Sequence, residues 1–312
     1  MESLDIQSAE AAAPQRTATL IAREGRRASE FPGYFANHLP MVIEAMAWMG
    51  ASPGRQDAFA ADYVRENEVS DLPPAQGTLP ADPWHTALGL REYEGDWRAH
   101  FADLVARQGI AATVRTALPT LAPGVAASAL HPLMRLAYAT MREDATEVSN
   151  ALGYWAATWR AFPPPEGPRT PTGPAALVAE MRSEPALHGV DGPTHLLWLW
   201  IAHMGTLPEF RRLTGRVPSV PDQLPEMRRA SLALYAGTMS FEALHAVTGC
   251  HWLRLLDLPH DLRGELAGHF WDVVLALYAK IGLPALPSED EMMEMRRLPV
   301  PEDSVIRAAA VA

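Results

Sequence analysis

Residues 95–108 read GDWRAHFADLVARQ, and they show most clearly which kind of structure the chain forms. The large apolar side chains in this stretch recur three and four residues apart, at Trp97, Phe101, Leu104 and Val105. A helix with 3.6 residues per turn places such side chains on one face and the intervening polar ones on the other. The sequence has no runs of Val, Ile and Thr with a period of two, which would indicate strands. It therefore predicts an all-α fold.

Apolar residues follow the same spacing on both sides of this helix. We expect further helices at LPMVIEAMAWMG after Asn37, near 53–67, and at 123–142, 145–162, 174–183, 193–204, 221–236, 240–257 and 259–281. The segment FPPPEGPRTPTGP cannot form regular structure, because proline fixes φ and lacks an N–H donor. We predict a single domain, residues 1–312, in which two helical halves surround a central cavity. The N-terminal half is about 30–162, the connection 163–174 and the C-terminal half 175–312.

The composition excludes several classes of protein. Of the 312 residues, 48% are hydrophobic and 20% are charged, as is typical of globular domains, and the net charge of −11 opposes binding to nucleic acid or an anionic membrane. The apolar run LLWLWIA (196–202) is far shorter than the roughly 18 residues of a membrane span. The N-terminus MESLDIQSAEAAAPQR does not resemble a secretory signal, and one cysteine, Cys250, allows no internal disulfide. We expect a cytoplasmic protein.

Local motifs do not explain the chemistry, because the sequence contains no phosphate-binding glycine loop, GxSxG, HExxH or EF-hand loop. Three of the eleven histidines lie in apolar helical runs: His38 in NHLPM, His131 in ALHPLMRLAYA and His245 in SFEALHAVTG. An imidazole in apolar surroundings needs a hydrogen-bond partner or a metal ion. The residues alone leave open whether these histidines are ligands or hydrogen-bonded core residues.

Aromatic and histidine side chains are the candidates for substrate contacts. His195 and His203 are eight residues apart in a tryptophan-rich segment, on roughly one helical face, where they could line a pocket for an aromatic ligand. The alternative is an ordinary amphipathic core helix. We also expect Trp48 and Tyr138 to contact the substrate.

Five stretches of sequence, in this order along the chain, carry a resemblance to a known family. They are NHLPMVIEAMAWMGAS from Asn37, EGDWRAHFADLVARQG from Glu94, LAPGVAASALHPLMRLAYATM from Leu121, EVSNALGYWAATW from Glu147 and LHAVTGCHWLR from Leu244. With these stretches the chain resembles bacterial members of the questin oxidase-like family. Fungal members of that family open anthraquinone rings oxidatively in aromatic polyketide pathways. The resemblance implies an oxygenase that acts on an aromatic or polycyclic polyketide-like secondary metabolite.

The resemblance also implies a metal site. Family members of at least one type hold a non-haem iron through several histidines and a carboxylated lysine. The matching histidines here are His38, His131 and His245, which would hold Fe(II) with positions open for O₂ and substrate. Glu44, about six residues after His38, would support this site.

The last part of the chain departs from the family pattern. Family members end in a segment like DEHxIK, whereas this chain has EDSVIR, with Ser304 and Arg307 at the histidine and lysine positions. A guanidinium stays protonated, cannot be carboxylated and repels a cation, although Glu302 or Asp303 could supply a carboxylate instead. The alternative to the oxygenase is a metal-free cyclase, isomerase or small-molecule-binding protein in which Arg307 binds an enolate or phenolate oxygen. A helical interaction scaffold is the third interpretation.

Overall fold

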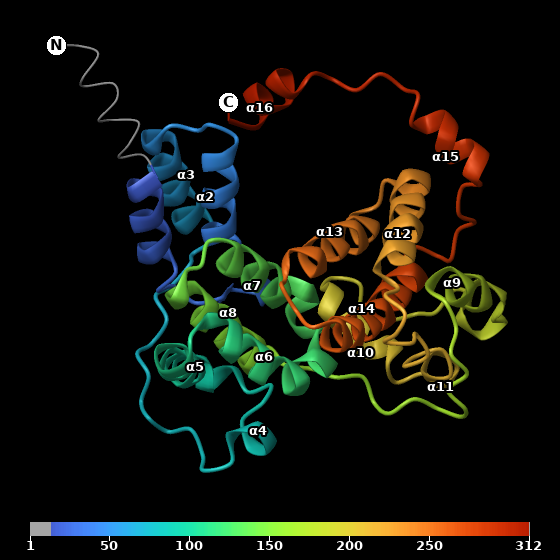
Figure 1. Cartoon of the computed structure of the whole chain (residues 1–312), viewed down its shortest axis with the longest axis horizontal. Coiled ribbons are helices and arrows are strands. Elements are labelled where there is room, and N and C mark those ends of the chain that lie inside the picture. The colour runs from blue at the N-terminus through green and yellow to red at the C-terminus, as the bar shows by residue number, and fades with distance from the viewer. Residues whose placement is uncertain (1–13, 312) are drawn as a thin grey trace. The chain divides into compact units, whose positions relative to one another are not determined.

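Helices make up nearly all of the regular structure of this protein (Figure 1). The computed structural model describes residues 14–311, apart from the side chains of His85 and residues 309–311. Within that part of the chain the strands are β1 (Glu30–Phe31) and β2 (Phe35–Ala36), an antiparallel pair in which Glu30 lies opposite Ala36. The prediction of an all-α fold is confirmed. Most of the N-terminal segment compared with a secretory signal lies outside the described residues.

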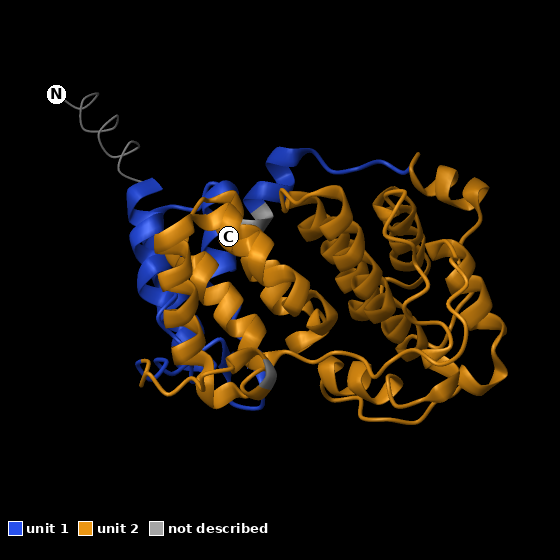
Figure 2. Ribbon diagram, turned by 60° about the horizontal axis from the view of Figure 1, so that its bottom comes forward, with its two compact units in different colours: residues 1–74, 298–312 blue, residues 75–297 orange. Residues whose placement is uncertain are grey.

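The chain divides into two compact units, one of residues 1–74 and 298–312 and the other of residues 75–297 (Figure 2). The first unit contains a helix over 14–24, α2 (Leu39–Trp48), α3 (Pro53–Glu66) and α16 (Asp303–Val311). The second contains α4 (Pro83–Thr86), α5 (Glu94–Gln108), α6 (Ile110–Leu121), α7 (His131–Met141), α8 (Ala145–Thr158), α9 (Pro174–Ser183), α10 (Leu197–Met204), α11 (Pro208–Arg211), α12 (Leu224–Thr238), α13 (Phe241–Leu255), α14 (His260–Lys280) and α15 (Glu289–Met295). Its 3₁₀ helices are η1 (Arg91–Tyr93), η2 (Ala122–Gly124), η3 (Ala127–Leu130) and η4 (Pro185–Leu187).

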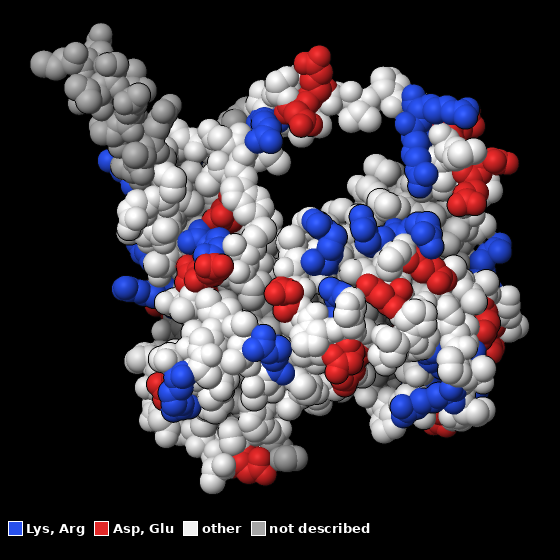
Figure 3. All heavy atoms as spheres, viewed as in Figure 1, with Lys and Arg blue, Asp and Glu red and all other residues white. Residues whose placement is uncertain are grey.

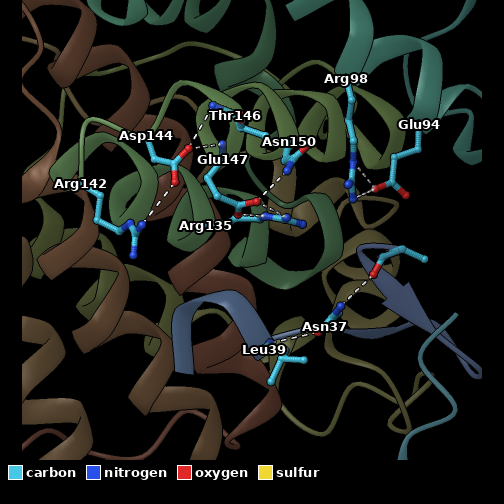
Figure 4. Close-up of polar contacts among 11 residues, drawn as sticks. Asn37, Leu39, Glu94, Arg98, Arg135, Arg142, Asp144, Thr146, Glu147 and Asn150 are labelled. Atoms are coloured by element: carbon cyan, nitrogen blue, oxygen red, sulfur yellow. Dashed lines mark hydrogen bonds and ion pairs between the residues drawn. The ribbon is translucent and has the colours of Figure 1, made fainter. Parts of the chain in front are cut away.

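The first unit has its own small core. Helix 14–24, α2 and α3 bury one cluster of apolar side chains, made of Leu20, Ile21, Leu39, Ile43 and Ala60. The loop that leads into α2 is fixed by Asn37, whose side-chain oxygen accepts the Leu39 N–H at 3.0 Å and whose amide donates to the Ala28 carbonyl at 3.0 Å (Figure 4). These bonds set the position of His38, the residue that directly precedes α2.

The second unit is built around α8, which is buried along nearly its whole length. Helices α5 and α7 both pack on α8, and α7 also packs on α13. Gly153 lets α5 and α8 approach closely, since a Cβ atom at this position would lie 2.8 Å from the backbone nitrogen of Arg98. On the other side α13 packs on α12 and α14. This arrangement brings the start of α7 against α13. The proline-rich segment 163–174 also lies inside this unit.

Several predicted helices are confirmed and others are wrong. The predicted helix at 174–183 has the same bounds as α9. The helix predicted over 123–142 is instead two short 3₁₀ turns followed by α7, and α6 was not predicted. The helix predicted from Pro193 begins only at Leu197. None of the described helices combines the length and the apolar character that crossing a lipid bilayer requires.

Candidate active site

The predicted site residues divide between the two units. The first unit contains His38, Glu44, Trp48 and Arg307. The second unit contains His131, Tyr138, His195, His203 and His245. Each group is described within its own unit.

Two of the predicted histidines lie side by side in the second unit. His131 is the first residue of α7 and His245 lies in the second turn of α13. Their ring centroids are 5.9 Å apart and their ring planes make an angle of 80°. The edge of one imidazole therefore faces the other, which places two polar ring systems at one point between two helices.

Hydrogen bonds to the backbone set the tautomer of both rings. Nδ1 of His131 bonds the carbonyl oxygen of Ser128, and Nδ1 of His245 bonds that of Phe241 at 2.8 Å. A carbonyl oxygen can only accept, so Nδ1 is the donor in each case. In the neutral ring the lone pair is then on Nε2, the nitrogen that can take a proton or bind a metal ion.

His38 has the same arrangement in the first unit. Its Nδ1 donates to the carbonyl oxygen of Ala36 at 2.8 Å, and its backbone N–H donates to the Tyr63 hydroxyl at 3.1 Å. All three histidines singled out by sequence thus have Nδ1–H held by a nearby carbonyl. This common tautomer is a feature that the sequence did not predict.

The backbone that leads into His131 is strained. Ser128, Ala129 and Leu130 have φ values of 40°, 53° and 72°, in the left-handed region that residues with a Cβ atom avoid. Each such residue costs about 1–2 kcal/mol, and only well-packed surroundings can hold three in a row. The run turns the chain so that α7 starts at His131, with Pro132 at its second position. Strain of this kind is concentrated at functional sites.

Buried contacts hold this strained turn in place. Residues 127–130 are all buried, and the hydroxyl of Tyr154 in α8 donates to Oγ of Ser128 at 2.7 Å. The carbonyl oxygen of Ser128 accepts the hydrogen bond from Nδ1–H of His131, as described above. Ser128 thus connects the imidazole to the buried helix α8.

A buried polar network supports α7 one turn after His131 (Figure 4). The guanidinium of Arg135 makes two hydrogen bonds to Glu147 in α8, at 3.0 and 3.1 Å, and Asn150 donates to the same carboxylate at 2.6 Å. A second pair, Arg98 and Glu94, lies in α5 with a shortest N–O distance of 2.5 Å. All five residues are buried. Buried charges persist only when they are paired, and the pair of Arg135 with Glu147 joins α7 to α8.

The charges in this network keep their ionised forms. Burial raises the pKa of Glu147, but the positive charge of Arg135 and its hydrogen bonds outweigh this effect and hold the pKa below its usual value. Burial lowers the pKa of Arg135, but the charge and hydrogen bonds of Glu147 raise it by more, so that it lies above its usual value. Both groups are therefore charged at neutral pH.

His245 is neutral at the same pH. Burial lowers its pKa, and the hydrogen bond to Phe241 and the charge of Glu242 offset this only in part. The Phe241 ring meets the imidazole edge-on with centroids 4.6 Å apart. Phe241 is itself 65% exposed, so it gives the imidazole an aromatic neighbour that solvent reaches. A neutral imidazole beside an exposed aromatic ring suits a base that receives a planar substrate.

Two of the first-unit candidates, Trp48 and Arg307, are joined at the C-terminal end of α2. Arg307 in α16 is exposed, and its guanidinium donates to the carbonyl oxygen of Trp48 at 2.8 Å. Trp48 is the last residue of α2, where a positive charge interacts favourably with the helix dipole. Trp48 is about half exposed, and Glu44 lies buried one turn earlier on the same helix. Ser304 lies exposed in α16, three residues before Arg307.

The remaining candidates of the second unit are Tyr138, His195 and His203, and only Tyr138 lies on the same helix as His131. Tyr138 lies seven residues after His131 in α7, and this spacing puts both on one helical face. His195 and His203 do not share a helical face, because His195 precedes the start of α10. His203 lies beside Trp200, with centroids 6.3 Å apart, and His195 is exposed. The expectation that these two histidines line one face of a helix was therefore wrong.

A comparison with protein-family models decides the identity of the family. The model described as Questin oxidase-like matches residues 35–309, most of the chain, including all three histidines and Arg307. The chain belongs to the questin oxidase-like family. A comparison with curated proteins gave no match.

The donor set expected for questin oxidase-like proteins is not complete within one unit. A non-haem iron site of this kind needs at least three protein ligands. Among the side chains that the structure describes, which do not include that of His85, no three His, Cys, Asp or Glu residues are grouped so that they could hold a metal ion. The second unit supplies two adjacent imidazoles, and Arg307, in the first unit, carries a guanidinium, which has no lone pair available for a metal ion. Neither unit supplies three such ligands by itself among its described side chains, and the three-histidine ligand set stays a prediction.

Several residues of this site were not predicted from the sequence. Ser128, Arg135, Glu147 and Phe241 position or accompany the two imidazoles, yet none was a candidate. Phe241 could have been found, since it lies four residues before His245 in the stretch SFEALH. The role of Ser128 could not, because the run Ser-Ala-Leu contains no glycine or asparagine to indicate left-handed backbone.

Proposed function

We propose that this questin oxidase-like protein is an oxygenase that acts on an electron-rich aromatic molecule of the polyketide type. In this proposal His131 and His245 bind and deprotonate a phenolic hydroxyl of the substrate. The observation that carries the proposal is the pair of adjacent imidazoles, each held with Nδ1–H on a backbone carbonyl. Membership of the family supports the reaction class and the kind of substrate.

The residues of the pair suit the first step of such a reaction. A phenolic O–H donates to Nε2 of one imidazole, and transfer of the proton gives a phenolate and an imidazolium. The carbonyl that accepts Nδ1–H stabilises the imidazolium, because the negative end of its dipole faces the ring. The phenolate is more electron-rich than the phenol and passes electrons to O₂ more readily. Phe241 supplies an aromatic edge against which a planar ring packs.

A metal-free cyclase or isomerase is the second candidate. It would use the same proton transfer on a phenol or enol and would need no O₂. The replacement of the family's histidine and lysine by Ser304 and Arg307 favours this candidate, since neither substitute is a usual iron ligand. Its substrate belongs to the same aromatic class.

Oxygen consumption by the full-length protein tests the proposal, with a polyhydroxylated anthraquinone as the probe. His131→Asn and His245→Asn should each lower the rate about 100-fold, as expected for loss of a general base. His188→Asn is the matched control, because His188 is an exposed histidine of the same unit whose ring bonds the Arg182 carbonyl. This variant should keep the wild-type rate.

Measuring product formation under anaerobic conditions separates the two candidates. Product that forms equally well without O₂ supports the cyclase or isomerase and contradicts the oxygenase. Iron content per chain, measured on wild type and His245→Asn, tests the three-histidine ligand prediction on its own. Unchanged rates of product formation in both histidine variants would contradict the assignment of the pair under either candidate.

A further inference from the structure

A small surface pocket lies between α12 and α13 in the second unit. Its volume is about 170 Å³, and it is lined by Arg228, Leu232, Val247, Cys250, His251 and Arg254. The helices are joined at its buried side by the contact between Oγ of Ser231 and Sγ of Cys250, at 3.6 Å. Both atoms belong to buried residues, so the pocket has a fixed inner wall.

Two arginine side chains give the pocket its charge. Arg228 comes from α12 and Arg254 from α13, and neither forms an ion pair within the described part of the chain. Arg254 donates to Nδ1 of His251 at 3.4 Å, which holds its guanidinium beside the pocket. Figure 3 shows basic side chains gathered over the region of α12 and α13. In a protein of net charge −11, two guanidinium groups without acidic partners at one pocket form a local site for an anion.

Apart from His251, the rest of the lining is apolar or a neutral thiol. Leu232 in α12 and Val247 in α13 supply its apolar side chains, and Cys250 stays a neutral thiol because burial raises its pKa to about 11. This combination suits a molecule with one anionic group and a small apolar body. The volume is below the roughly 300 Å³ at which pockets for drug-sized molecules begin, so the pocket suits a small molecule better than a polycyclic substrate.

The pocket is separate from the histidine pair, although both use α13. At about 100° per residue, Val247, Cys250, His251 and Arg254 lie roughly 140° to 240° around the helix from His245. They therefore occupy the face of α13 opposite to His245. His245 contacts α7, whereas the pocket is closed by α12.

We propose that this pocket is a binding site for a small organic carboxylate, distinct from the candidate active site. The carboxylate group is held between the guanidinium groups of Arg228 and Arg254, and the apolar body of the ligand packs on Leu232 and Val247. The proposal is independent of the function proposed for the histidine pair.

Isothermal titration calorimetry with benzoate tests the site in the full-length protein. Arg228→Gln and Arg254→Gln should each weaken benzoate binding about tenfold or more, since each removes a charge-assisted contact. Arg229→Gln is the matched control, because Arg229 is the next residue of the same helix, is exposed and does not line the pocket. His245→Asn should leave benzoate binding unchanged. Arg228, Arg229 and Arg254 are exposed and His245 is buried. Circular dichroism checks that all four variants fold.

Two further probes define the ligand class. Benzyl alcohol, which has the same ring without a charge, should bind at least about tenfold more weakly than benzoate. Inorganic phosphate, which has charge without an apolar body, should also bind more weakly than benzoate. Absence of benzoate binding, equal affinity for phosphate, or wild-type affinity in both pocket variants would overturn the proposal. Loss of benzoate binding in His245→Asn would do so as well, because it would place benzoate at the histidine pair.

Discussion

The two histidines of the candidate site are presented by helices that begin in different ways. Helix α13 begins after Ser240, whose hydroxyl accepts the Ala243 N–H at 3.1 Å, and His245 follows one turn later in regular helix. Helix α7 begins after three left-handed residues, and its N-terminus has no capping side chain. His131 is the first residue of that helix.

This difference shows two ways of fixing an imidazole. In α13 local hydrogen bonds within one helix suffice, since both the cap and the carbonyl of Phe241 lie within a few residues of His245. In α7 the turn before His131 depends on contacts with α8, through Tyr154 and through the ion pair of Arg135 with Glu147. The position of His131 therefore depends on tertiary structure and that of His245 mainly on local sequence.

The largest effect is expected from the ion pair that supports α7. Glu147→Gln leaves the guanidinium of Arg135 buried without its carboxylate, which should lower the free energy of unfolding by about 3–5 kcal/mol. Urea denaturation measures the change. Glu265→Gln, at an exposed position of α14, should stay within about 0.5 kcal/mol of wild type. A loss below about 1 kcal/mol in Glu147→Gln would show that α7 does not depend on this pair.

A pair of glycine substitutions measures the backbone strain directly. Ala129 lies in the left-handed run and Ala246 in regular α13, and both are buried. Each change to glycine loses one methyl group and adds backbone entropy to the unfolded chain, so these effects largely cancel in the comparison. Relief of strain should make Ala129→Gly about 1–2 kcal/mol more stable than Ala246→Gly in urea denaturation. Equal stabilities would mean that the left-handed run is not strained.

The cap of α13 should have a smaller effect. Ser240→Ala removes the acceptor of the Ala243 N–H and should lower the free energy of unfolding by about 1 kcal/mol. Ser183→Ala, at the exposed C-terminal end of α9, is the control and should change stability by less than about 0.5 kcal/mol. A loss no larger than that of the control would remove the local explanation for how His245 is positioned.

The smallest effect is the contribution of His245 to the pH dependence of stability. Its pKa in the folded protein is below the usual value of 6.5, so the unfolded chain binds its proton more readily. The stability linked to this group is present above about pH 6.5 and is lost as the pH falls through the lowered value. Between about pH 7.5 and pH 5, wild type should lose more stability than His245→Asn. The difference isolates His245 from the other histidines with lowered pKa, His100, His251 and His269. Equal losses would show that His245 is not buried as a neutral ring.

The sequence was sufficient for the helices that are determined locally. Apolar spacing predicted α9 with its bounds and α13 and α14 within two residues. Their apolar surroundings also singled out His131 and His245 as candidates, and the structure places these two rings side by side. Their proximity depends on the packing of α7 on α13, and no local pattern encodes that contact.

The failures have physical causes. Apolar spacing continues through 123–142, so the pattern predicts one helix where the backbone turns left-handed at Ser128–Leu130. The contacts that stabilise this turn come from Tyr154, more than twenty residues away in sequence. The late start of α10 could not be predicted from local sequence either, because neither His195 nor Leu196 is a helix-breaking residue.

The left-handed run before His131 also has a stereochemical consequence. Over three residues the chain adopts the backbone region that mirror-image amino acids favour, and none of the three is glycine. A D-alanine placed at position 129 by chemical ligation would sit in its own preferred conformation, whereas anywhere in α13 it would disrupt the helix. At this one turn the chirality of the residues and the handedness of the chain are opposed, and the surrounding protein imposes the result.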